Sequence, residues 1–125
     1  MTHPADQRSV EKTIDDLLDA SSAADEIVNR GIDAWNSDRL LRLAGEAVIN
    51  RIGDAANKLP EEVRNAIPEV PSDEIRSNRI LVAHIYHRID YQILWETLVH
   101  DVPPLAQALT QWRENISRRP GRSRP

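Results

Sequence analysis

The chain has 125 residues, a length that predicts a single domain. Its formal net charge is −4, and a content of 40% hydrophobic and 29% charged residues is typical of a soluble globular domain. No apolar run approaches the roughly 20 residues that span a bilayer, the polar start lacks a secretory signal, and the absence of cysteine excludes disulfides and thiolate chemistry. These features predict a cytoplasmic protein.

Two long helices are predicted in the first half of the chain. Ser9 is the expected N-cap of the first, whose apolar residues follow helical spacing until Gly31 ends it. Residues 36–38 offer caps for the second helix, which runs to Pro60 with an apolar stripe of Leu41, Ala44, Val48, Ile52, Ala55 and Leu59.

Two glycines, Gly45 and Gly53, lie inside the second predicted helix. A glycine within a helix costs about 1 kcal/mol relative to alanine. Their presence therefore indicates the close approach of another helix, one from a second subunit being among the options.

The second half of the chain is divided by prolines. Pro60 opens a short helix, and a Pro-bounded connection leads to a helix that starts at Ser72 and runs to Ile89. Asp90 is the expected cap of the next helix, which Pro103 and Pro104 kink or restart before it continues to about residue 116. No stretch shows strand alternation, so the sequence predicts an all-α fold, with four main helices and a short one in an up-down bundle.

Charge is distributed unevenly along the chain. Residues 1–38 hold nine acidic and three basic residues, whereas residues 118–125 hold four arginines and no acid. We therefore predict a helical domain over 1–117 followed by a basic, disordered tail over 118–125. The body has no broad basic face, so binding to duplex DNA is not expected.

One helix carries residues suited to metal-free phosphoryl chemistry. Arg79 can hold a phosphate and stabilise transition-state charge, and His84 can act as a general base or acid. Arg79 and Tyr86 share a helix face, but Arg79 and His84 lie about 140° apart around the helix. Two helices packed together could bring both groups to one atom. His84 and His87 are three residues apart, but no third ligand is evident, so neither a metal site nor a cofactor is predicted.

The segment around this motif resembles a known family. Within residues 75–105, four residues separate Arg79 from His84, and one residue separates His84 from Tyr86. An Ile-Asp pair, an apolar-Trp pair and a Pro-Pro-Leu segment follow. Upstream, INRIGDAANKLPEEVR is similar to the family's Ile-Gly-Glu-Ala-Ala helix. Over about residues 37–110 the chain resembles the HEPN superfamily, and within it the HepT-like toxins of bacterial toxin–antitoxin pairs.

The resemblance implies a function and a set of site residues. It implies a helical homodimer whose two copies form one cleft, and a metal-independent endoribonuclease in which His84 assists attack of the ribose 2′-OH while Arg79 stabilises the transition state. The implied partner is an MNT-type nucleotidyltransferase antitoxin that attaches AMP to Tyr86.

The chain departs from the family pattern beside the motif arginine. Ile80 stands where the family commonly has Asn, while Asn78 precedes Arg79 as a possible supporting residue. This departure keeps open one alternative, a non-catalytic HEPN module that only binds nucleotides or a partner protein. A separate alternative, from a different class, is a structural helical adaptor in which Arg79 and His84 form interface bonds.

Overall fold

The computed structural model describes residues 4–66 and 90–118, and in these ranges the chain is helical with no strand. Its elements are α1 (Pro4–Asn29), α2 (Ile32–Ser37), α3 (Arg39–Lys58), α4 (Glu61–Ala66), α6 (Tyr91–Glu96), the π-helix η2 (Thr97–Asp101) and α7 (Val102–Arg118). The predicted all-α bundle is thereby confirmed. None of the described helices is long and apolar enough to cross a membrane.

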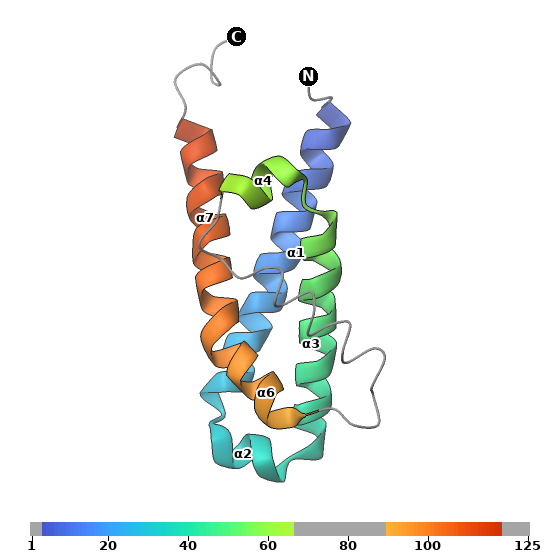
Figure 1. Ribbon diagram of the computed structural model, residues 1–125, viewed down its shortest axis with the longest axis vertical. Coiled ribbons are helices and arrows are strands. Elements are labelled where there is room, and N and C mark those ends of the chain that lie inside the picture. Colours follow the sequence, from blue (N-terminus) through green and yellow to red (C-terminus); the bar gives the residue numbers. More distant parts are fainter. Residues whose placement is uncertain (1–3, 67–89, 119–125) are drawn as a thin grey trace.

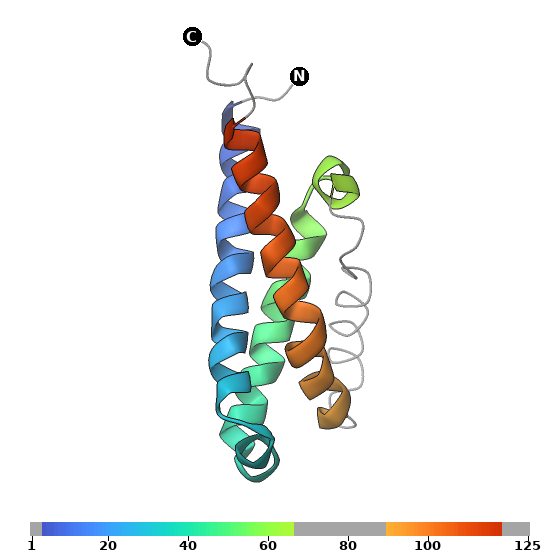
Figure 2. The same cartoon turned by 90° about the vertical axis from the view of Figure 1, so that its left-hand side faces the viewer.

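Three long helices, α1, α3 and α7, lie side by side and form the body of the bundle (Figure 1). Helix α2 closes the end away from the termini, and α4 crosses the other end. Helix α6 and η2 lead directly into α7, as the turned view in Figure 2 also shows. The core between these helices is aliphatic, apart from Trp35, and its largest fully buried members are Trp35, Ile14, Leu17, Ile49, Ile52, Leu98, Leu105, Leu109, Val63 and Val102.

The first helix begins earlier than the sequence suggested. The prediction that Ser9 is its N-cap is wrong, because α1 starts at Pro4 and the carbonyl of Ser9 already accepts a bond from the Thr13 hydroxyl at 2.9 Å. Proline suits the first position of a helix, since its fixed φ is helical and its missing N–H would have no partner there. Gly31 ends this part of the chain as expected, with a φ of +90° that glycine adopts at little cost.

The cap of α6 is Asp90, as predicted, and the cap of α3 is Asp38, one of the three residues that the sequence offered. An Asp38 carboxylate oxygen accepts the backbone N–H groups of Leu40 and Leu41 at 2.9 and 3.4 Å. At α6, an Asp90 oxygen accepts those of Gln92 and Ile93 at 3.0 and 3.2 Å. Each side chain satisfies donors that the first turn of a helix leaves free.

The short helix α2 was not predicted, and it supplies the close neighbour of Gly45. Trp35 of α2 is 1% exposed, and a Cβ added to Gly45 would lie 2.5 and 2.7 Å from two atoms of its ring. The close neighbour of Gly45 is thus a helix of the same chain, so Gly45 gives no support for a second subunit. Ala44, expected in the buried stripe, is exposed because the buried face of α3 runs instead through Gly45, Ile49 and Ile52.

The double proline restarts the helix through a wider turn. Neither Pro103 nor Pro104 has an N–H, and a proline ring clashes with the carbonyl four residues earlier. In η2 the N–H of Val102 reaches back five residues to the carbonyl of Thr97, after which both prolines occupy the first turn of α7. The predicted restart is confirmed.

The acidic residues of α1 are partly explained by cross-helix ion pairs. Arg51 of α3 pairs with Asp19 at 3.2 Å and with Asp16 at 4.0 Å, and Arg113 of α7 pairs with Asp15. Exposed pairs of this kind contribute about 0–1 kcal/mol each. They link α1 to both of its neighbours, so these carboxylates have a role within the bundle.

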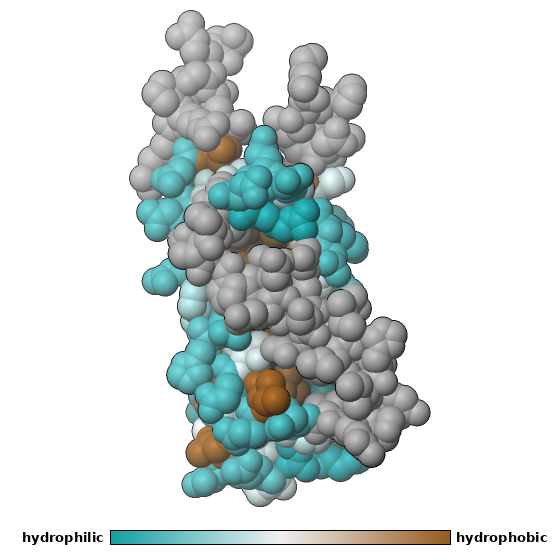
Figure 3. Space-filling model, viewed as in Figure 1, coloured by the Kyte–Doolittle hydropathy of each residue, from teal (hydrophilic) through white to brown (hydrophobic). Residues whose placement is uncertain are grey.

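On the face shown in Figure 3, the described surface is mostly hydrophilic, with a hydrophobic area over α6. Among the described residues, the large apolar side chains that are exposed are Ile32, Leu40, Leu43 and Ile93. Ile93 is 52% exposed, whereas Leu94 and Leu98 are buried.

Candidate functional site

The predicted site residues Arg79, His84 and Tyr86 lie outside the described residues, as do Asn78 and Ile80. The described chain stops at the end of α4 and resumes at Asp90, directly before α6. The described residues are therefore the scaffold to which residues 67–89 are joined.

A polar and aromatic cluster lies where the chain resumes. We define the α6 junction cluster as Trp35, Arg42, Glu46 and Tyr91. The Tyr91 hydroxyl donates a hydrogen bond to Glu46 of α3, and the indole N–H of Trp35 donates to the backbone carbonyl of Tyr91 at 3.0 Å. The two rings pack edge to face, with centroids 6.2 Å apart.

Arg42 completes the α6 junction cluster. Its guanidinium carbon lies 5.3 Å from the centroid of the Tyr91 ring, which is within the range of a cation–π contact. The same guanidinium donates to the carbonyls of Trp35 and Asn36, both at 2.9 Å. Because these carbonyls belong to α2, Arg42 connects α2, α3 and α6 at one point.

The groups of the α6 junction cluster shift the pKa of Tyr91, which is the only tyrosine besides Tyr86. The hydrogen bond to Glu46, followed by partial burial and the negative charge of Glu46, raises the pKa of Tyr91, against the opposing effect of Arg42 and Arg39. The Tyr91 hydroxyl is therefore held as a hydrogen-bond donor to Glu46 and stays protonated near neutral pH.

The raised pKa predicts how stability depends on pH. Since the pKa of folded Tyr91 lies above the ordinary value of 10.0, its hydrogen bond contributes fully below pH 10, and the contribution is lost as the pH rises through the folded pKa. The difference in urea midpoint between the parent and Tyr91→Phe should be constant near neutral pH and shrink above pH 10. A difference that stays the same up to pH 11 would contradict this assignment.

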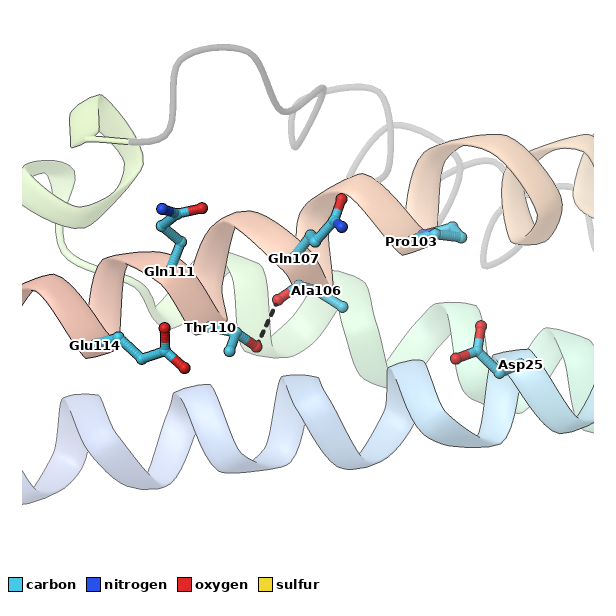
Figure 4. Close-up of a pocket in the computed structure, with 7 residues that line it drawn as sticks. All are labelled: Asp25, Pro103, Ala106, Gln107, Thr110, Gln111 and Glu114. Carbon is cyan, nitrogen blue, oxygen red and sulfur yellow. Dashed lines mark hydrogen bonds between the residues drawn. The ribbon is translucent and has the colours of Figure 1, made fainter.

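A second candidate is an open groove of about 450 Å³ between α1 and α7 (Figure 4). The described residues that line it are Asp25, Pro103, Ala106, Gln107, Thr110, Gln111 and Glu114. Two carboxylates and no cation stand among them, and the Thr110 hydroxyl donates to the carbonyl of Ala106 at 2.9 Å. Such a lining repels a phosphate and offers no general base of the histidine type, so the groove does not fit phosphoryl chemistry.

The one histidine among the described residues, His100, lies on the surface. His100 is exposed and lies 3.0 Å from a Glu96 carboxylate oxygen one turn earlier. No group of three or more His, Cys, Asp or Glu residues that could hold a metal ion occurs in the ranges 4–66 and 90–118.

Comparison with known proteins identifies a family and several similar chains. The family described as Ribonuclease HepT-like matches residues 17–112. A protein of Methanocaldococcus jannaschii named "Putative RNase MJ0125" is 27% identical over 93 residues, which cover 71% of this chain and 80% of that protein. A protein of Thermococcus cleftensis named "Probable ribonuclease HepT" is 25% identical over 100 residues, covering 79% of this chain and 91% of that protein. No solved structure gives a significant match.

The family match confirms the predicted resemblance, and its range includes Arg79, His84 and Tyr86.

Proposed function

Because this chain belongs to the HepT-like ribonuclease family, we propose that it is the toxin of a bacterial toxin–antitoxin pair and cleaves RNA internally without a metal ion. The observation that carries the proposal is the motif of Arg79, His84 and Tyr86, which occurs with its flanking residues in the family's order inside the matched range.

The chemistry follows from the groups that the motif supplies. His84 takes the proton from a ribose 2′-OH as the oxygen attacks the adjacent phosphorus. The bond from phosphorus to the 5′-oxygen of the next nucleotide breaks, that oxygen takes up a proton, and a 2′,3′-cyclic phosphate remains on the first product. Arg79 stabilises the negative charge that develops on the phosphate oxygens. DNA lacks the attacking hydroxyl and is not a substrate.

The site is proposed to form between two copies of the chain, because the helix predicted from the sequence would place Arg79 and His84 about 140° apart. A dimer lets the arginine of one copy and the histidine of the other meet at one phosphate. We expect light scattering at micromolar concentration to give twice the 14.2 kDa of one chain. A particle of 14.2 kDa at high concentration would exclude a shared site.

The proposed regulator is an MNT-type nucleotidyltransferase encoded beside this chain, which transfers AMP to the hydroxyl of Tyr86 and releases pyrophosphate from ATP. The attached phosphate would compete with RNA for Arg79. Co-expression should therefore add the mass of one or more AMP groups, with every modified peptide containing Tyr86.

Tyr91→Phe is the matched control for this modification, because its hydroxyl is engaged by Glu46. Tyr86→Phe should escape modification and stay toxic despite the partner, whereas Tyr91→Phe should be modified like the parent. If Tyr86→Phe is still silenced, inhibition works by binding alone.

The experiment that tests the proposed function is controlled expression in bacteria. Expression of the chain alone should arrest growth, and co-expression of the neighbouring nucleotidyltransferase should restore it. Normal growth with abundant folded protein would oppose the toxin assignment and favour the non-catalytic HEPN module that Ile80 leaves open.

A further inference from the structure

We draw no further inference here: the strongest candidate, the exposed apolar stripe of Leu40, Leu43, Ala44 and Ala47 along α3, carries none because nothing in the described residues shows what covers it.

Discussion

Replacing Arg79 or His84 with alanine is expected to lower the rate of RNA cleavage by roughly 10²–10⁴-fold. His84→Ala removes the group that takes the proton from the 2′-OH, and Arg79→Ala removes the cation that stabilises the charged transition state. The change should be measured with purified protein on one RNA oligonucleotide under single-turnover conditions, with circular dichroism to verify that the helices remain.

His87→Ala is the control for this experiment, because it removes an imidazole three residues from His84 that the mechanism does not use. It should cleave RNA at the parental rate and arrest growth like the parent. Retention of parental activity by His84→Ala would mean that the histidine is not catalytic, and the mechanism proposed here would be wrong.

The largest effect on stability is expected from Trp35→Ala, at about 3–5 kcal/mol of unfolding free energy. Trp35 is 1% exposed, packs on Gly45 and on Trp95, and donates to the carbonyl of Tyr91. Its removal leaves a cavity between α2 and α3 and frees the start of α6. Urea denaturation followed by circular dichroism measures the loss.

Trp112→Ala provides the comparison, because Trp112 of α7 packs against the core while only partly buried. It should cost clearly less than Trp35→Ala. An equal or smaller loss at Trp35 would show that α2 contributes little to the bundle.

Much of the fold could be predicted because it depends on local chemistry. Asp38 and Asp90 are caps whose side chains bond within three residues, so their roles are visible in the sequence. The restart at Pro103 follows from a missing N–H and a fixed ring. The same local reasoning failed at Ser9, where a good capping residue lies inside a helix that had already begun at Pro4.

Features that depend on contacts between distant residues could not be predicted. Helix α2 has only six residues, too few to show a period, and the burial of Trp35 depends on the absence of a side chain at Gly45. That absence also shifts the buried face of α3 away from Ala44. A glycine inside a helix indicates that another element packs closely against it. Only the three-dimensional structure shows which element that is, and whether it belongs to the same chain.

In the candidate site, too, some features could be predicted from the sequence and others could not. Arg79, His84 and Tyr86 were found from a short motif and its flanks, and the ribonuclease family predicted from them is confirmed by the match over residues 17–112. The bond between Glu46 and Tyr91 joins residues 45 apart in sequence. Neither residue belongs to a chemical motif, so only the fold shows that they meet.

The central claim is metal-independent cleavage of RNA by the 2′-hydroxyl, and one measurement tests it most directly. The purified chain is incubated in excess EDTA with an RNA oligonucleotide and with the same oligonucleotide carrying 2′-deoxyribose at the cleaved position. We expect cleavage of the first to a 2′,3′-cyclic phosphate and none of the second. Binding of both oligonucleotides without cleavage of either, or cleavage only when a divalent metal is restored, would contradict the account.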